Sequence, residues 1–150
     1  MKIKKMYQGT APENKILNTQ SESQTDVYSC DYINKLNTYS TEETIIGTWI
    51  DGKPLYRKTL TFNTTINSNT PLYIAHNISN VDTIFVDYSH SYFWNDTVGS
   101  YSLPIVGYDG GFTDTVYCIV NKNDVVVCST GGWGESWRKH ITIKYTKTTD

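Results

Sequence analysis

Apolar side chains recur at every second position along much of the chain after residue 41, which is the period of half-buried β-strands. From Ile84 to Trp94, apolar and aromatic residues alternate with mostly polar ones, and this run predicts one long strand with an aromatic face. The segment 137–146 carries Ile141, Ile143 and Tyr145 in the same period and predicts the last strand of the domain.

Turn residues divide the rest of this region into shorter strands. The Asp51-Gly52 pair predicts a hairpin between a strand at 44–50 and a return strand that ends near residue 62. The other predicted elements are a loop at 62–71, a turn at 95–99, a short strand at 101–106, a turn at 108–111, a hairpin of 112–120 with 125–130, and a glycine-rich loop at 131–134. Seven or eight strands joined by tight turns indicate an all-β fold, an antiparallel β-sandwich of the jelly-roll kind.

The first 40 residues follow a different pattern. Residues 1–25 are polar and have no clear period, so they predict an N-terminal arm or linker. Residues 26–40 begin with a residue suited to an N-cap and predict a short helix with one apolar stripe, formed by Tyr28, Tyr32, Leu36 and Tyr39. Such a helix is not stable alone in water, so it either docks on its own chain or bundles with copies of itself as an oligomerisation neck. The head domain is then expected at 41–150.

Composition removes several classes of function. The formal net charge is -2, so the electrostatic case for binding nucleic acid is absent. No apolar run approaches the length of a membrane span, and no apolar stretch follows the first lysines as it would in a signal peptide. We therefore expect synthesis in the cytoplasm and no membrane insertion. The 12 Tyr and 4 Trp against 4 Phe suit interfaces and sugar-stacking sites, although β-strands also favour Tyr in general.

Motifs for catalysis or for a cofactor are missing. His76, His90 and His140 have no metal-ligand spacing, and the turns at Asp109 and Asp124 lack the ligand series of a calcium loop. Cys118 and Cys128 are expected on the two arms of one hairpin. We interpret these two cysteines and Cys30 as small structural thiols. We expect a protein that is not an enzyme and that uses neither a metal nor a cofactor.

Aromatic residues in or beside the predicted loops are the candidate ligand site. A ring packs on the apolar face of a sugar, and an adjacent Asp or Asn binds its hydroxyl groups. Trp133 is the first candidate, because its flanking glycines are expected to leave the indole exposed. Its candidate neighbours are Trp94, Tyr101, Tyr108 and Asp109. The alternative is that such rings cap the core, which is the interpretation we favour for Trp49 and Trp137 on predicted strands.

Several segments resemble one family. The pieces are residues 28–33 (YSCDYI), 39–43 (YSTEE), 47–58 (GTWIDGKPLYRK) and 141–150 (ITIKYTKTTD), with 76–80 (HNISN) and 3–9 (IKKMYQG) as further pieces. Together they are similar to phage and prophage tail-fibre and minor structural proteins. The similarity covers both ends of the β-region and little of residues 81–137. It brings no catalytic residues, and it implies a homotrimeric domain of the virion tail that contacts other tail proteins and binds the host surface.

Three functional hypotheses follow from these observations. The first is a receptor-binding tail-fibre domain that recognises a host cell-surface polysaccharide without catalysis. The second is a purely structural, trimerising tail module. The third is a small glycan depolymerase, which would need two carboxylates facing each other across a cleft.

Overall fold

A computed structural model describes residues 38–107 and 114–149, which belong to one compact unit. In these residues the regular structure is antiparallel β-sheet with one short 3-10 turn, which confirms the all-β prediction. The elements are β1 (Thr44–Thr48), β2 (Pro54–Phe62), β3 (Leu72–Ala75), β4 (Val81–Val86), η1 (Tyr88–His90), β5 (Tyr92–Asn95), β6 (Gly99–Ser102), β7 (Ile105–Val106), β8 (Thr115–Val120), β9 (Asp124–Ser129) and β10 (Arg138–Lys147).

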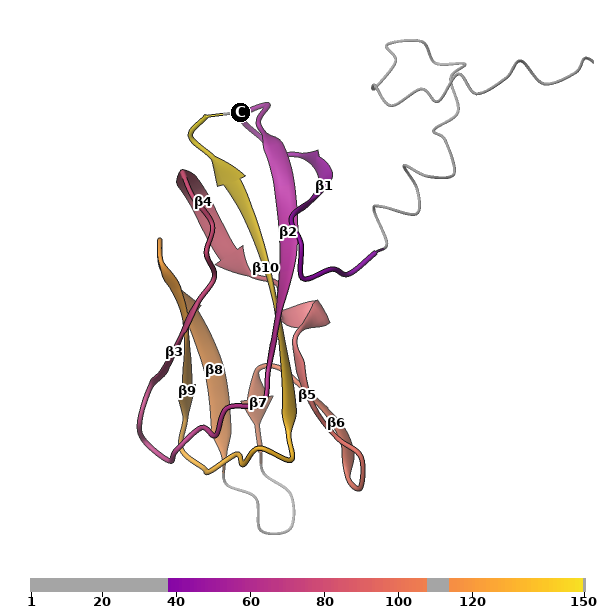
Figure 1. Cartoon of the computed structure of the whole chain (residues 1–150), viewed down its shortest axis with the longest axis vertical. Helices are drawn as coiled ribbons and strands as arrows, with labels where there is room; N and C mark the ends of the chain where they lie inside the picture. Colours follow the sequence, from indigo (N-terminus) through magenta and orange to yellow (C-terminus); the bar gives the residue numbers. More distant parts are fainter. Residues whose placement is uncertain (1–37, 108–113, 150) are drawn as a thin grey trace, which may run out of the picture. The chain divides into compact units, whose positions relative to one another are not determined.

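The strands form a large sheet and a small sheet (Figure 1). The large sheet has the order β1-β2-β10-β5-β6, and β4 also pairs with β10. The small sheet has the order β3-β9-β8-β7. Side chains from both sheets meet in one hydrophobic core, formed by Ile66, Ile78, Val81, Phe93, Leu103, Ile105, Val116, Cys118, Val125, Val127, Trp133, Ile141, Ile143 and Tyr145. The two sheets therefore share a single buried interior.

β10 is the central strand of the large sheet. Along one edge it pairs with β2, from Lys139↔Phe62 to Tyr145↔Tyr56, and along the other it pairs with β4 and β5. Its side chains alternate as the period predicts: Ile141, Ile143 and Tyr145 are fully buried in the core. The residues between them lie on the opposite face of the sheet, which we call the outer face.

The long strand predicted at 84–94 is interrupted. Val86 in β4 and Tyr92 in β5 both pair with β10, but residues 87–91 leave the sheet, and η1 lies within them. The turn is fixed by hydrogen bonds to Thr142: the Asp87 N–H donates to the Thr142 carbonyl, and the Thr142 N–H donates to the Ser91 hydroxyl. Alternation of residue type could not reveal this interruption, because the polar residues of the turn also fit a strand.

The strand predicted at 101–106 is divided between the two sheets. β6 pairs with β5 in the large sheet, whereas β7 pairs with β8 in the small one. Leu103 is buried in the core between them, so the chain crosses from one sheet to the other at this point. A local pattern does not distinguish one straight strand from two short strands in different sheets.

The predicted hairpins are confirmed. β1 pairs with β2 around Asp51-Gly52, where Gly52 has a φ of +87° that favours glycine. β5 pairs with β6, and β8 pairs with β9. In the last hairpin, Cys118 lies opposite Val127 and Cys128 lies opposite Tyr117, so the two thiols point to opposite faces of the sheet. Both are free, and burial raises the pKa of Cys118 to about 12.

Most of the predicted helix at 26–40 lies outside the described residues, together with the arm at 1–25. Its last residues, 38–40, are not helical. They instead follow β2: the Thr59 N–H donates to the Ser40 carbonyl at 2.8 Å, and the Arg57 guanidinium donates to the Thr38 carbonyl. The prediction of a helix as far as residue 40 is wrong because these sheet contacts replace helical hydrogen bonds.

Neither Trp133 nor Trp49 lies in the environment that the sequence predicted. Trp133 is only 4% exposed, so the prediction of an exposed indole is wrong. Its backbone exchanges two hydrogen bonds with Ile66, and its indole N–H donates to Ser129 at 3.1 Å. The Asp114 carboxylate occupies the space where a Gly131 side chain would stand, so this glycine allows close packing of the loop. Trp49, in contrast, is half-buried and lies outside the core cluster. Its ring packs against the Phe85 ring, with the ring centres 5.4 Å apart.

These positions predict different losses of stability for the two tryptophans. We expect Trp133→Ala to lower the free energy of unfolding by about 3–5 kcal/mol, because it leaves a cavity among packed rings. Trp49→Ala should cost about 1–2 kcal/mol, since that ring is half solvated. Urea denaturation of both variants measures the difference, and equal losses would contradict the assignment of Trp133 to the core.

Candidate functional site

A pocket of about 400 Å³ lies on the outer face of the large sheet. Its floor comes from cross-strand neighbours: His140 of β10 lies between Thr61 of β2 and Tyr92 of β5. Thr59, next along β2, pairs with Thr142 of β10. The described residues that line the pocket are Tyr39, Ser40, Thr41, Thr59, Thr61, Ser89, His90, Tyr92 and His140. The volume is within the range of small-molecule sites.

The segment before β1 forms one wall of the pocket. Arg57 projects from β2 onto the outer face, is buried, and holds this segment. Its guanidinium carbon lies 4.2 Å from the centre of the Tyr39 ring, a cation–π contact. Together with the hydrogen bond from Thr59 to the Ser40 carbonyl, this contact fixes the Tyr39 ring at the pocket.

The turn η1 continues this wall. His90 lies beside the Tyr39 ring, with ring centres 4.8 Å apart, and Tyr92 stacks on His140 at 4.7 Å. The two tyrosines and two histidines come from four different segments of the chain. The pocket is thus lined by two packed pairs of rings together with the hydroxyl groups of serine and threonine.

The buried Asp87 carboxylate holds η1 through its contacts with Ser89 and His90. Burial raises its pKa, but hydrogen bonds from Lys144, Ser89 and His90 outweigh that effect and bring the pKa down to about 2. The ionised carboxylate can only accept, so the His90 Nδ1, 2.9 Å away, must be the donor. In neutral His90 the remaining ring nitrogen, Nε2, is therefore an acceptor.

The pocket lining has no permanent charge. None of the described lining residues is Asp, Glu, Lys or Arg. Burial lowers the pKa of His140, and the nearby Arg138 lowers it further, so His140 is neutral at pH 7. Its Nδ1 lies 3.2 Å from the Thr61 hydroxyl. Such a surface is suited to an uncharged ligand with many hydroxyl groups and some apolar area.

The geometry does not form a Ser-His-Asp triad. A triad needs the carboxylate and the hydroxyl on different nitrogens of the imidazole. Here the Ser89 hydroxyl donates to Asp87 and lies near the same Nδ1 that contacts that carboxylate.

Within residues 38–107 and 114–149, no three His, Cys, Asp or Glu side chains are grouped so that they could hold a metal ion. In the same ranges no helix has the length and apolarity needed to cross a membrane.

Of the predicted site residues that the structure describes, Trp133 and Tyr101 lie together, with ring centres 5.9 Å apart, but they pack in or against the core and do not form an exposed site. Trp133 is in the core, and Tyr101 is half-buried against Trp133 and Trp137. Trp94 is exposed on the outer face, beyond the residues that line the pocket. Tyr108 and Asp109 lie outside the described residues, as do Tyr28, Tyr32 and Leu36 of the expected oligomerisation stripe. Tyr39, the fourth residue of that stripe, lines the pocket.

Sequence reasoning missed the pocket because its residues are distant in the chain. The alternation at 84–94 does place His90 and Tyr92 on one aromatic face. The alternation of the strand at 55–62 likewise places Thr59 and Thr61 on one side. What was missing is the register, because only the pairing with β10 places Thr61, His140 and Tyr92 in one row.

Comparison of the chain with protein-family models, with curated proteins and with solved structures finds no match.

Asp87 predicts a specific loss of stability in acid. Its pKa is about 2 in the folded protein and 3.8 in the unfolded chain, so its contribution is complete above about pH 4 and disappears as the pH falls to 2. The difference in the free energy of unfolding between the wild type and Asp87→Asn should therefore shrink by about 2 kcal/mol between pH 5 and pH 2. Urea denaturation at several pH values measures this gap.

Asp96→Asn is the matched control for this prediction. Asp96 also pairs with a cation, Arg138, but both side chains are largely exposed. Solvent screens such a pair, so the gap for Asp96→Asn should change little over the same pH range. An Asp87→Asn gap that stays constant with pH would show that the ion pair with Lys144 does not stabilise the fold.

Proposed function

We propose that this protein is a non-catalytic carbohydrate-binding domain that attaches a phage tail to a host cell-surface polysaccharide. The observation that carries the proposal is a pocket whose described lining has no Asp, Glu, Lys or Arg and in which Tyr39, Tyr92 and two imidazoles accompany serine and threonine hydroxyls. A sugar has apolar C–H faces and a rim of hydroxyl groups. Aromatic rings and hydroxyl groups match both parts of that surface.

The absence of carboxylates from the described lining favours binding over hydrolysis. A depolymerase of the usual kind requires two carboxyl groups, one on each side of the bond that is cleaved. Asp87, the carboxylate behind η1, is ionised and bound to Lys144, Ser89 and His90. It is therefore not available as a proton donor.

The tail assignment rests on the resemblance of residues 26–58 and 141–150 to tail-fibre and minor structural proteins. That resemblance supports a head with a jelly-roll β-sandwich, a homotrimer, contacts to other tail proteins and a location in the virion. A trimer also suits the chemistry of the pocket. A sugar offers little apolar area, so each pocket should bind weakly, and three linked pockets would raise the overall affinity through effective concentration.

A purely structural module is the second candidate, and one surface favours it. The side of the small sheet that faces away from the core exposes Tyr73, Val106, Tyr117 and Ile119, with Val106 77% exposed. In the ladder, Tyr73 and Ile119 flank Val126, while Tyr117 pairs with Cys128, so the middle of this face carries no charge. Asp124 lies on the same face at the beginning of β9, so a second copy of the chain could cover the middle of the face without burying an unpaired charge.

Replacing Tyr92 tests the carbohydrate-binding proposal. The full chain is first applied to immobilised polysaccharides purified from bacterial cell surfaces, and soluble fragments of a retained polysaccharide are then titrated by calorimetry. We expect Tyr92→Ala to lower the affinity for the fragments about tenfold or more, because it removes a stacking ring from the pocket.

Tyr73→Ala is the control for this experiment, since it removes an exposed tyrosine from the small sheet, away from the pocket. Its affinity for a soluble fragment should equal that of the wild type. Failure of the wild type to retain any bacterial surface polysaccharide would overturn the proposal. Equal losses in both variants would overturn the assignment to this pocket.

The oligomeric state tests the second candidate. If the outer side of the small sheet joins copies of the chain, Ile119→Lys should convert the oligomer into a 17.1 kDa monomer, because it places a charge at the centre of the contact. Sedimentation velocity at micromolar concentration measures the mass. A wild-type chain that is already monomeric would contradict both the trimer and this interface.

A further inference from the structure

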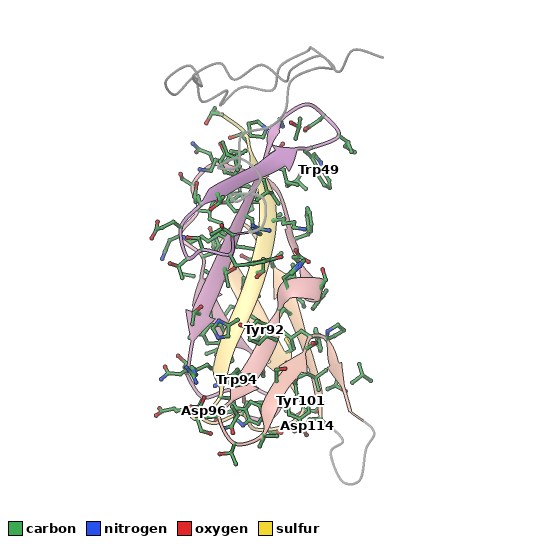
Figure 2. All side chains as sticks on the ribbon, turned by 90° about the vertical axis from the view of Figure 1, so that its right-hand side faces the viewer. Trp49, Tyr92, Trp94, Asp96, Tyr101 and Asp114 are labelled. Atoms are coloured by element: carbon green, nitrogen blue, oxygen red, sulfur yellow. The ribbon has the colours of Figure 1, made fainter. Side chains whose placement is uncertain are left out.

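A second exposed ring follows the pocket along β5. Tyr92 and Trp94 are two residues apart on this strand, so both point to the outer face, and each is 38% exposed. Two residues of an extended strand span about 7 Å. Figure 2 shows Tyr92, Trp94 and Asp96 one after another along the same side of the body.

Polar side chains flank both rings in matching rows. Tyr92 lies between His140 of β10 and Ser102 of β6, and Trp94 lies between Arg138 and Ser100. The two serines are exposed. Each ring on this face therefore has a hydroxyl on one side and a nitrogen-bearing side chain on the other, so the row of Trp94 repeats the arrangement found at the row of Tyr92.

A hydrogen bond from the ring N–H fixes the orientation of the Trp94 indole. Its Nε1–H donates to the Asp96 carboxylate at 2.9 Å, and Arg138 donates to the same carboxylate oxygen. An indole anchored through its edge loses less conformational freedom when a ligand covers its face. The contacts also leave Asp96 and Arg138 paired with each other, so the row presents no unpaired charge.

We propose that Tyr92 and Trp94 are two successive stacking positions of one binding strip, and that the ligand is a linear, neutral oligosaccharide running along β5 from the pocket to the 95–99 turn. This inference rests on the proposed function and specifies its ligand class. The separation of the two rings is of the order of one sugar residue, so neighbouring residues of a chain would occupy them. A monosaccharide could fill only the pocket.

Dependence of affinity on ligand length tests the strip. Fragments of one to six residues, prepared by partial acid hydrolysis of the retained polysaccharide, are titrated into the full chain by calorimetry. For the wild type, affinity should rise about tenfold between one residue and three or four residues, as the second ring becomes covered. Neutral fragments should bind more tightly than charged fragments of equal length.

Trp94→Ala should abolish this rise and leave the affinity for the shortest fragment within about twofold of the wild type. Trp94→Phe should keep most of the rise, because it keeps a ring. Tyr92→Ala should weaken all fragments, and Tyr73→Ala, on the small sheet, should change none. A rise that persists in Trp94→Ala, or a preference for charged fragments, would overturn the strip while leaving the pocket intact. Failure of every polysaccharide to bind would overturn the proposed function itself.

Discussion

The alternation of β10 between two environments is the constraint on which the rest of the structure depends. This strand hydrogen-bonds to β2 along one edge and to β4 and β5 along the other, so its register decides which residues of the large sheet become neighbours. Ile141, Ile143 and Tyr145 close the core on one face. His140 and Thr142 support the pocket and its wall on the other. A shift of one residue would exchange the two sets and abolish both core and pocket.

The interruption of the strand between β4 and β5 is what turns a sheet surface into a pocket. In a continuous strand, Ser89 and His90 would lie flat in the sheet, whereas η1 raises them into a wall. The turn contacts both the small sheet and the pocket. The Tyr88 hydroxyl donates to the Cys118 carbonyl of β8, and His90 lines the pocket. Burying Asp87 is unfavourable, and its contacts with Lys144, Ser89 and His90 offset that cost.

Aromatic residues serve two purposes within a few positions of each other. Phe93 points into the core and packs edge-on against Trp133, whereas its neighbours Tyr92 and Trp94 are exposed on the outer face. The period of the strand separates these roles. The rings of Trp133, Tyr101 and Trp137 then close one end of the core. The same β5 strand therefore ties the stability of the domain to the orientation of the proposed binding strip.

Local chemistry in the sequence was sufficient for the fold class, the hairpins and the buried face of β10. Period-2 alternation reports which side chains share a face, and Asp51-Gly52 reports a turn, because both depend on neighbours in the chain. The same alternation already placed His90, Tyr92 and Trp94 on one side of a strand. None of these signals needed knowledge of a distant segment.

Tertiary structure alone decided the interruption at residues 87–91, the burial of Trp133 and the membership of the pocket. Each depends on partners more than forty residues away: Thr142 for the turn, Ile66 for the tryptophan, and the register of β2 and β5 on β10 for the pocket. Flanking glycines suggested an exposed Trp133, yet the same glycines allow the close approach that buries it. Residue type sets what a side chain can do, and long-range pairing determines which surface it reaches.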